Sequence, residues 1–242
     1  MDFNGIDVST HQGQIDWMQV KASGIQYAII KCGGSDAGYY KDKWFEYNYA
    51  QARAQGIKIG TYYYVNDRFL TFDEAVRQAR HCLTILEGRE LDLPVYVDIE
   101  AKPLAGHKKE VTEAALAFMA TIGKEGGYRY GVYGSDISGF KDRMDYQLFL
   151  LNKDISIWCA RYGSQPKWAT KWDIWQSSSS GSVPGIAERV DTDVVKPEAF
   201  GDKPADLSTP AATTVPQAVS VVEGNMTKEL AHKIYNIIKE YM

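Results

Sequence analysis

Two carboxylates stand at the end of an apolar run in residues 93–100 (LPVYVDIE). Side chains of a β-strand alternate between its two faces, so Asp98 and Glu100 are expected on the same face, together with Tyr96. Ionised groups resist burial, so two acids at the mouth of an otherwise apolar strand are costly unless they have a function. A close pair of carboxylates is what general-acid cleavage of a glycosidic bond requires. The segment therefore predicts an active site built on Asp98 and Glu100.

Repulsion between the two acids predicts a division of roles. Carboxylates about 5 Å apart at an effective dielectric near 20 repel by roughly 3 kcal/mol, or about two pKa units. One of them is therefore expected to stay protonated near neutral pH, as a general acid must. Glu100 has the longer side chain and lies nearer the rim, so we expect it to donate the proton. We expect Asp98 to stay charged beneath it.

The elements that must position this pair follow from alternating apolar and amphipathic runs over about the first 195 residues. Strands are expected at 3–9, 27–33, 58–65, 94–100, 128–135, 155–162, 173–177 and 187–191, and helices at 15–23, 43–54, 72–86 and 111–124. Such alternation indicates βαβ units and a parallel sheet. About eight strands in this length favour an α/β fold, an irregular TIM-like β/α barrel with a reduced set of helices. An open doubly wound sheet is the alternative.

Two further acids are expected on the same rim of the barrel. Functional groups of a β/α barrel gather at the C-terminal ends of its strands. Asp7 lies near the end of the first predicted strand, and Asp191 ends the last one. The first and last strands of a closed barrel are neighbours, so these two acids should lie side by side, across the rim from Asp98 and Glu100. A loop or helix-capping role is the competing interpretation for either acid alone.

Aromatic and basic residues near the predicted strand ends are candidate sugar-binding groups. The aromatic candidates, whose flat faces and polar tips suit a sugar, are Tyr62, Tyr64, Tyr133, Trp158 and Trp175. A core position is the alternative for each, because aromatic residues dominate such interiors. Lys31 and Arg161 are candidate cationic members of the pocket. Extension of their charged ends into solvent is the competing interpretation.

Composition and motif content disfavour several other functions. The chain has 242 residues, and its net charge of −4 argues against nucleic acid as a partner, since phosphate binding needs a basic face. Three scattered cysteines are too few for a disulfide framework and are expected to be buried thiols. The four histidines show no metal-ligand spacing, and neither a phosphate-binding loop nor a Gly-x-Ser-x-Gly elbow occurs. We expect neither a metal nor another cofactor.

The two ends of the chain give expectations about targeting and organisation. The N-terminus has no basic region and no apolar run, so we expect no signal peptide, and no segment is long enough to insert in a membrane. We expect a catalytic barrel at 1–200, a Pro/Ala/Ser/Thr-rich linker at 201–225 and an amphipathic helix at 226–242. A lone helix is marginal in water. It is expected to dock on the barrel, form a homodimer or begin a further module.

Several motifs in this chain resemble the glycoside hydrolase family 25 lysozymes of the Chalaropsis type. They are GIDVS at 5–9, QG-x-IDW at 12–17, DIE at 98–100, WDIWQ at 172–176, GSVPGI at 181–186 and VD at 190–191. The motifs occur in the family's order and spacing. The resemblance covers about residues 3–195, and the motifs are highly specific together.

This resemblance implies an N-acetylmuramidase that cuts the β-1,4 bond between N-acetylmuramic acid and N-acetylglucosamine in peptidoglycan, without a cofactor. It implies that Glu100 is the acid/base and that Asp98 assists, with Asp7 and Asp191 completing the cluster. Gln176 of the WDIWQ motif joins the candidate substrate-binding residues. Retention of configuration is expected, with either a protein carboxylate or the substrate's own acetamide as nucleophile. The expected absence of a signal peptide resembles a phage endolysin made in the host cytoplasm and released through a holin to lyse the bacterium.

Two functions of other kinds stay open from the sequence alone. A catalytically silent carbohydrate-binding barrel would use the same aromatic rim, although it has no use for four crowded acids. A metal-dependent hydrolase would use those acids as ligands. The first alternative predicts glycan binding without cleavage, and the second predicts an activity that a chelator abolishes.

Overall fold

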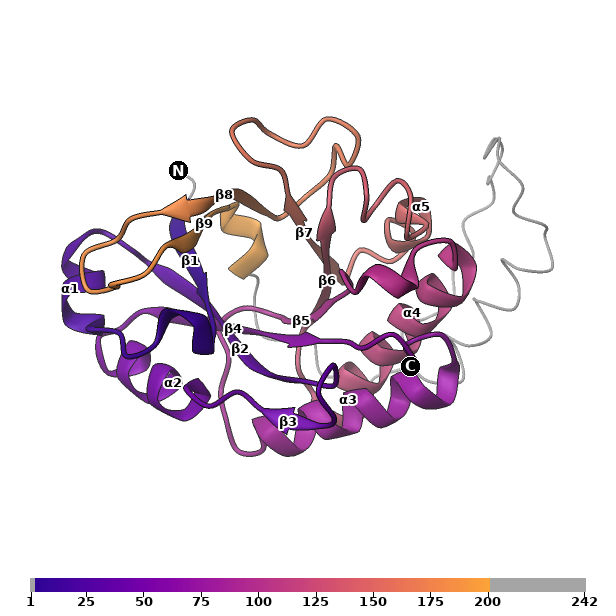
Figure 1. Cartoon of the computed structure of the whole chain (residues 1–242), viewed down its shortest axis with the longest axis horizontal. Helices are drawn as coiled ribbons and strands as arrows, with labels where there is room; N and C mark the ends of the chain where they lie inside the picture. The colour runs from indigo at the N-terminus through magenta and orange to yellow at the C-terminus, as the bar shows by residue number, and fades with distance from the viewer. Residues whose placement is uncertain (1–2, 201–242) are drawn as a thin grey trace, which may run out of the picture.

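Eight strands form a closed barrel in the computed structural model, which describes residues 3–200 (Figure 1). They are β1 (Phe3–Val8), β2 (Tyr27–Gly34), β4 (Lys58–Tyr64), β5 (Val95–Asp98), β6 (Tyr130–Ser135), β7 (Ile155–Ala160), β8 (Ile174–Gly181) and β9 (Val190–Val195). The order around the ring is β1-β9-β8-β7-β6-β5-β4-β2, and pairing of β1 with β2 closes it. The predicted closed barrel is confirmed, and the open-sheet alternative is wrong. The predicted linker 201–225 and helix 226–242, with its proposed dimer, lie outside the described residues.

The last strand runs against the others, which differs from the parallel arrangement that we expected. β9 is antiparallel to both β1 and β8, whereas the remaining neighbours in the ring are parallel. Asp191 was expected to end the last strand, but it lies near the beginning of β9. Because the strand is reversed, its beginning lies at the same rim as the end of β1. Asp191 is thus paired with Asp7 after all.

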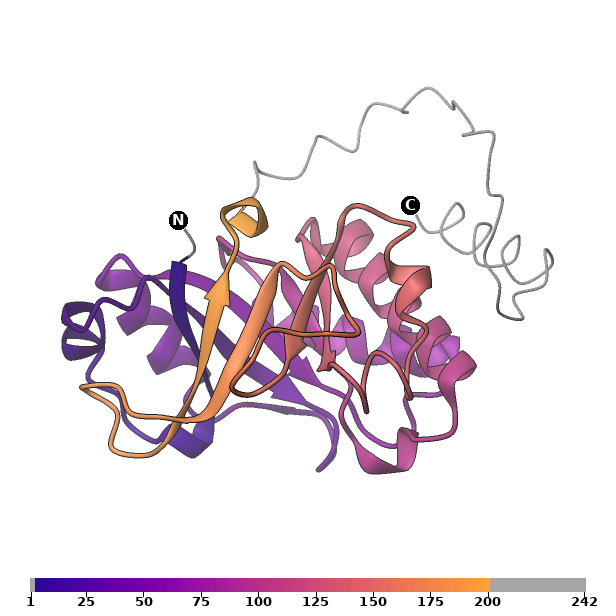
Figure 2. The same ribbon diagram turned by 90° about the horizontal axis from the view of Figure 1, so that it is seen from above.

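Helices cover one side of the barrel and leave the other side to loops (Figures 1 and 2). They are α1 (Trp17–Ala22), α2 (Phe45–Ala54), α3 (Phe72–Leu86), α4 (Lys108–Gly126) and the short α5 (Tyr146–Phe149). The short β3 (Tyr40–Lys41) pairs with β2. α3 begins where Thr71 Oγ1 accepts a bond from the backbone N–H of Glu74 at 3.2 Å. No helix within residues 3–200 is long and apolar enough to cross a bilayer.

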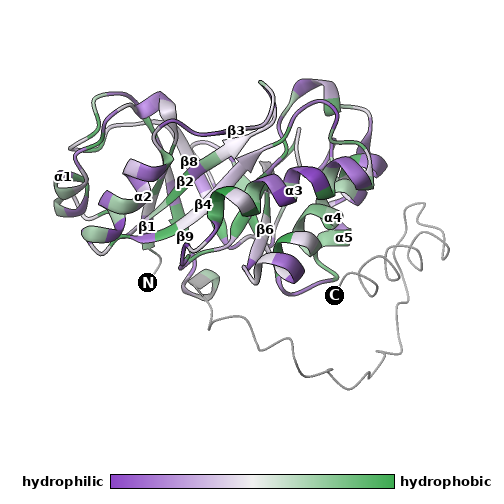
Figure 3. Cartoon of the chain, turned by 90° about the horizontal axis from the view of Figure 1, so that it is seen from below, coloured by the Kyte–Doolittle hydropathy of each residue, from purple (hydrophilic) through white to green (hydrophobic). Residues whose placement is uncertain are grey.

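Side-chain alternation along the strands separates two apolar layers. Val95, Val97 and Ile99 of the predicted motif belong to the layer between barrel and helices, whereas Tyr96 and Trp158 help to fill the barrel interior. The helix ribbons in Figure 3 accordingly change between green and purple along their length, as expected for helices with one face on a barrel. The interior is therefore a packed core, and polar chemistry is confined to the rim.

The three cysteines are buried free thiols, as predicted. Cys32 on β2 and Cys82 on α3 bring their Sγ atoms to 3.7 Å, within the outer apolar layer. Burial raises the pKa of the Cys82 thiol well above its usual range. These thiols therefore act as small apolar side chains that join helix and barrel.

Candidate active site

Five carboxyl groups gather at the rim where β1 and β5 end and β9 begins. Asp98 is the last residue of β5, Glu100 follows two residues later, and Asp7 lies on β1. Asp191 and Asp193 lie on β9. Tyr133 on β6 lies close enough to Glu100, Asp98 and Asp7 that the charges of all three raise the pKa of its hydroxyl group. The structure thus brings together the four acids that the sequence predicted, and adds Asp193.

The Asp98–Glu100 pair holds its protons more tightly than isolated carboxyls do. Asp98 is 4 % exposed, and burial, followed by repulsion from Glu100, raises its pKa well above the usual value. Glu100 is open to solvent at the mouth, yet the surrounding protein displaces part of its hydration and raises its pKa as well. In the ligand-free protein the pair therefore retains a proton at higher pH than isolated carboxyl groups do. The assignment of the proton to Glu100 and of the charge to Asp98 stays a prediction.

Two cations near the pair, Arg143 and Lys31, oppose this effect. Arg143 is almost completely buried, and its Nη1 donates to the backbone carbonyl of Ile99, between the two acids, at 3.0 Å. Lys31 lies over the ring of Tyr64, with its Nζ 4.8 Å from the ring centroid. Both cations lower the pKa values of Asp98 and Glu100. Lys31 was predicted, whereas Arg143 was missed because it lies on a loop far along the chain.

Gln176 connects the second group of acids. Its side chain is 1 % exposed, and its Nε2 donates to Asp7 Oδ2 at 2.7 Å and to Asp191 Oδ2 at 3.2 Å. Its Oε1 accepts from the hydroxyl of Tyr133 at 2.9 Å. Two neighbouring carboxylates on the other side require the amide nitrogen to face them, which fixes the orientation of the amide. Gln176 thereby joins β8, β1, β9 and β6 in one hydrogen-bond network.

Asp193 is a member of the site that the sequence analysis missed. It is 2 % exposed and accepts a bond from Trp158 Nε1 at 2.8 Å. Its other carboxyl oxygen, Oδ2, is buried without a hydrogen-bond partner among residues 3–200. Burial raises the pKa of Asp193 to about 7, and burial with repulsion from Asp193 and Asp191 raises that of Asp7. Asp7 and Asp193 are therefore a second pair of carboxyl groups with raised pKa values, beside Asp98 and Glu100.

Aromatic rings form the floor and wall of the mouth. Trp158 lies within the barrel, with its ring centroid 4.4 Å from that of Tyr133 and 5.9 Å from that of Tyr62. The charges of Asp98 and Glu100 raise the pKa of the Tyr64 hydroxyl, so Tyr64 also lies at this rim. Tyr162, which was not predicted, is exposed and bonds Gln176 Oε1 through its hydroxyl at 3.4 Å.

Two predicted residues do not join this group. Trp175 follows Ile174, which points into the barrel, so its own side chain packs in the outer layer and its Nε1 donates to the carbonyl of Arg161 at 2.6 Å. Arg161 pairs with the buried Asp136 at 2.6 Å. Asp136 also accepts bonds from three backbone N–H groups of residues 167–169. Both residues fix a loop instead of contacting the acids.

The cluster combines carboxyl groups of raised pKa with nearby cations in an open mouth. Asp98 Oδ1 is buried without a hydrogen-bond partner among residues 3–200. A buried acceptor of this kind is costly unless a ligand donates to it. Within the same residues, no group of three His, Cys, Asp or Glu side chains is arranged to hold a metal ion. The geometry fits general acid–base chemistry on a polar substrate that brings its own donors.

Comparisons with known proteins were made on sequence and on structure. The autolytic lysozyme of Clostridium acetobutylicum is 29 % identical over 190 residues, which are 78 % of this chain and 54 % of that protein. This chain thus spans about half the length of that relative. The CTP1L endolysin shares 26 % identity with a TM-score of 0.70, over 82 % of this chain and 68 % of that one.

A further solved structure and a family profile complete the comparison. A family 25 glycosyl hydrolase from Bacillus anthracis shares the fold, at 22 % identity and a TM-score of 0.67, over 82 % of this chain and 91 % of that one. Residues 6–186 match the family described as glycosyl hydrolases family 25. This range contains the Asp98–Glu100 pair, Asp7, Gln176 and most of the barrel. The chain therefore belongs to glycosyl hydrolase family 25.

Proposed function

We propose that this protein is a lysozyme, a 1,4-β-N-acetylmuramidase that hydrolyses the glycan strands of bacterial peptidoglycan. The observation that carries the proposal is the Asp98–Glu100 pair, whose pKa values are raised and whose buried Oδ1 on Asp98 lacks a donor. The names of the related autolytic lysozyme and of the CTP1L endolysin support it. Aromatic rings and amides around the mouth suit a sugar substrate.

Substrate binding completes the assignment of the proton. The N–H of a bound acetamido group donates to Asp98, which stabilises the charged form of this carboxylate. The proton of the coupled pair then resides on Glu100, whose side chain reaches the mouth. Glu100 donates it to the glycosidic oxygen as the C1–O bond breaks, and its carboxylate later removes a proton from the attacking water. Attack on C1 by a carboxylate or by the acetamide oxygen gives retention in either case.

The biological setting is also a proposal. The similarity to an endolysin supports lysis of a host bacterium from within, by a protein that is made in the cytoplasm and released to the wall through a holin. Peptidoglycan is then the partner, and neither nucleic acid nor membrane insertion has a part in the reaction. Asp7 and Asp191, held by Gln176, orient the sugar on the side of the cleft opposite Glu100.

Clearing of a peptidoglycan suspension tests the proposal. Wild type should clear it, and Glu100→Gln should clear it at less than about one hundredth of that rate, as expected for loss of a general acid. The surface substitution Glu87→Gln is the matched control and should behave as wild type. Mass spectrometry of the products should place the new reducing end on muramic acid. Clearing by both wild type and Glu100→Gln, or by neither, would contradict the proposal.

Two readouts separate the alternatives from this proposal. Glycan binding by wild type without any clearing would indicate a carbohydrate-binding barrel. Loss of clearing in EDTA would indicate a metal-dependent hydrolase, whereas we expect undiminished activity. A new reducing end on glucosamine would make the enzyme a glucosaminidase.

A further inference from the structure

Lys31 holds its ammonium group among three tyrosine rings at the mouth of the barrel. It lies near the end of β2, two residues after the inward-facing Ile29, so its half-buried side chain is also directed inwards. Its Nζ lies 4.8 Å from the ring centroid of Tyr64, 5.9 Å from that of Tyr62 and 5.7 Å from that of Tyr40. Rings at such distances attract a cation, so they fix the position of the ammonium group.

The three N–H donors of this ammonium group have no acceptor in the part of the chain that the structure describes. Within residues 3–200, Lys31 Nζ makes neither a hydrogen bond nor an ion pair. The faces of the tyrosine rings attract its charge, but they do not replace three hydrogen-bond acceptors. Because the cation is half-buried, it has lost part of its hydration, and a substrate oxygen that accepts its hydrogen bonds would compensate for that loss.

Two further cations near the acids are engaged with the protein itself. Arg143 is almost completely buried and donates to the backbone carbonyl of Ile99 at 3.0 Å. Arg161 pairs with the buried Asp136 at 2.6 Å. Of these three cations, Lys31 is the one whose donors are open to a ligand.

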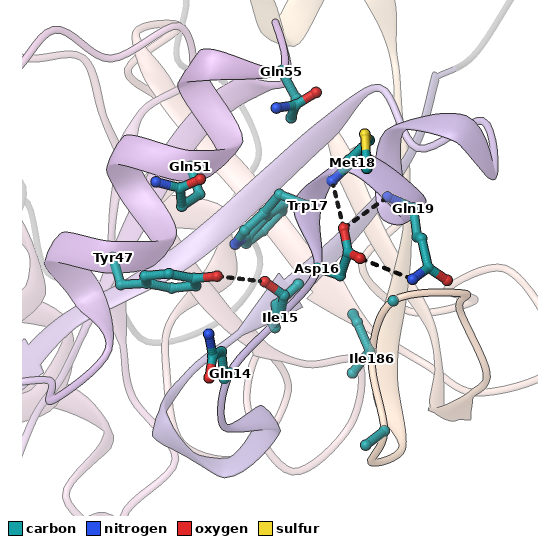
Figure 4. Close-up of a pocket in the computed structure, with 12 residues that line it drawn as sticks. Gln14, Ile15, Asp16, Trp17, Met18, Gln19, Tyr47, Gln51, Gln55 and Ile186 are labelled. Atoms are coloured by element: carbon teal, nitrogen blue, oxygen red, sulfur yellow. Dashed lines mark hydrogen bonds between the residues drawn. The ribbon is translucent and has the colours of Figure 1, made fainter.

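A groove elsewhere on the molecule contains no cation among its described lining residues. It lies outside the barrel, between the segment that leads into α1, one face of α2 and the connection from β8 to β9 (Figure 4). Asp16 is the one charged side chain in this lining, and its carboxylate already caps α1 by accepting bonds from Met18 N at 3.1 Å and Gln19 N at 3.2 Å. An acidic ligand is therefore attracted to Lys31 at the mouth and not to this groove.

Muramic acid carries an acceptor that N-acetylglucosamine lacks. The two sugars differ by the lactyl ether on O3 of muramic acid, whose carboxyl group is free in bare glycan and amide-linked where a stem peptide is attached. Its carbonyl oxygen accepts hydrogen bonds in both forms. In the free form, the acids of the mouth would repel its charge unless a cation lay beside it. Lys31 supplies both the donors and the opposite charge.

The position of Lys31 relative to Asp98 suits this group. In the proposed function, the acetamido N–H on C2 of the bound sugar donates to Asp98, and the lactyl arm leaves the adjacent ring carbon, C3. Tyr64 pairs with Asp98 in the ladder between β4 and β5, and the ammonium group lies over the ring of Tyr64. Lys31 also acts electrostatically on Asp98. The lactyl arm of a sugar held by Asp98 therefore starts within reach of Lys31.

We propose that Lys31 is a specificity-determining residue, which binds the lactyl carbonyl group and so distinguishes muramic acid from N-acetylglucosamine beside Asp98. The inference rests on the proposed function for the identity of the polymer. An ion pair adds to the hydrogen bonds where the carboxyl group is free. Strands with free carboxyl groups therefore gain more affinity from Lys31 than strands with amide-linked ones, and salt reduces the difference.

Binding of three forms of peptide-free glycan strands tests this role. The lactyl arm carries the carboxylate, its methylamide or, after reduction of the carboxyl group, a hydroxymethyl group without a carbonyl oxygen. The measurement uses the full-length Glu100→Gln protein, so that the strands stay intact. Adding Lys31→Met should weaken binding of the carboxylate form about tenfold, of the methylamide form about threefold and of the reduced form less than about twofold. An altered protonation of the acids would instead change all three affinities alike.

Two variants control for charge and for packing. Lys31→Arg keeps a cation with several donors and should restore most of the affinity for the carboxylate form. Lys196 also lies over an aromatic ring, with its Nζ 3.9 Å from the centroid of Trp172, but it follows the end of β9, at the opposite end of the barrel from the mouth. Lys196→Met should bind all three forms as the parent protein does. Circular dichroism with thermal unfolding checks the fold of each variant.

The outcomes separate this proposal from the proposed function. Equal losses for the carboxylate and reduced forms in Lys31→Met, or no loss at all, would overturn the role of Lys31. A loss for the carboxylate form alone supports lactyl recognition on bare strands, and a loss for both carbonyl forms supports it on peptide-bearing strands as well. If wild type cleaves no glycan but Lys31→Met shows the graded loss, lactyl recognition stands and the muramidase proposal fails. Cleavage by wild type together with equal affinities in Lys31→Met and its parent would overturn the role of Lys31 and leave the muramidase proposal standing.

Discussion

Asp7 and Asp191 lie opposite each other in the ladder between β1 and β9, and one amide, that of Gln176, donates to both carboxylates. The reversed direction of β9 makes this possible, because it puts the start of the last strand beside the end of the first. Acids far apart in the chain therefore share one donor. The geometry of the site depends on the seam at which the barrel closes.

Replacing the shared donor should destabilise the protein most at neutral pH. Gln176→Glu removes two N–H donors and adds a further carboxyl group beside Asp7 and Asp191, so we expect the free energy of unfolding to fall by about 3 kcal/mol at pH 7. The loss should be smaller near pH 4, where the introduced carboxyl group is protonated and can donate a hydrogen bond. Urea unfolding at both pH values measures it. The same change at the exposed Gln147 should cost under about 0.5 kcal/mol, and an equal loss at both positions would contradict the role of Gln176.

Removing the Arg143 guanidinium should move the pH dependence of activity. Because Arg143 lowers the pKa values of Asp98 and Glu100, Arg143→Gln should shift the alkaline limb of the kcat/KM profile upwards, by up to about one pH unit. Loss of the bond to Ile99 O should also reduce kcat about tenfold. Arg143→Lys keeps the charge, so it should restore the position of the alkaline limb but only part of kcat. Arg80→Gln on the surface is the control, and an unshifted limb in Arg143→Gln would refute the electrostatic role.

Asp193 should make the protein less stable as the pH rises. Its folded-state pKa of about 7 lies above the unfolded value, so its contribution is fully present below about pH 4 and is lost as the pH rises through 7. Asp193→Asn keeps the acceptor for Trp158 but removes this titration. Between pH 5 and pH 8 it should lose about 2 kcal/mol less stability than wild type. Parallel pH curves for the two proteins would show that Asp193 does not titrate as stated, and the exposed Asp67→Asn is the control.

A methyl group at Gly5 should destabilise the barrel. A Cβ at this position would overlap the ring of Tyr27, which is fully buried inside the barrel and cannot move aside. We expect Gly5→Ala to cost about 3 kcal/mol, at the upper end for overpacking a core. Thermal or urea unfolding measures it. A cost below about 0.5 kcal/mol would show that the interior around Tyr27 yields more readily than its packing indicates.

Strand parity explains which of the predicted residues face the acidic mouth. The alternation in residues 95–100 placed Asp98 on the inner face, and the structure agrees. The same rule excludes one of two adjacent residues, so Trp175 and Gln176 cannot both face inwards, and Gln176 does. Along β7, inward-facing Trp158 and Ala160 predict Tyr162 and not Arg161 at the mouth. Parity applied to each strand would have predicted the orientation of both Trp175 and Arg161.

Other members of the site were beyond the reach of sequence patterns. Asp193 repeats the i, i+2 spacing of the Asp98–Glu100 pair, but the last strand was expected to end at Asp191. Arg143 lies on a loop whose path over Ile99 depends on tertiary packing alone. The direction of β9 was also unpredicted, since a hairpin and a crossover without a helix leave similar patterns in sequence. The local sequence pattern thus predicted most of the strands, whereas the contacts of Arg143 and Asp193 around the other acids depend on tertiary packing.

The seam between β1 and β9 also governs when the cluster of acids can assemble during synthesis of the chain. β1 leaves the ribosome first, but its partner β9 ends at Val195, so the ring stays open until nearly all of the barrel sequence has emerged. Contacts between such distant segments form late and slow folding. Asp7 meets Asp191 and Gln176 only at that moment. A nascent or truncated chain therefore carries the Asp98–Glu100 pair without its partners, and the cluster of acids is complete only when the final strand pairs.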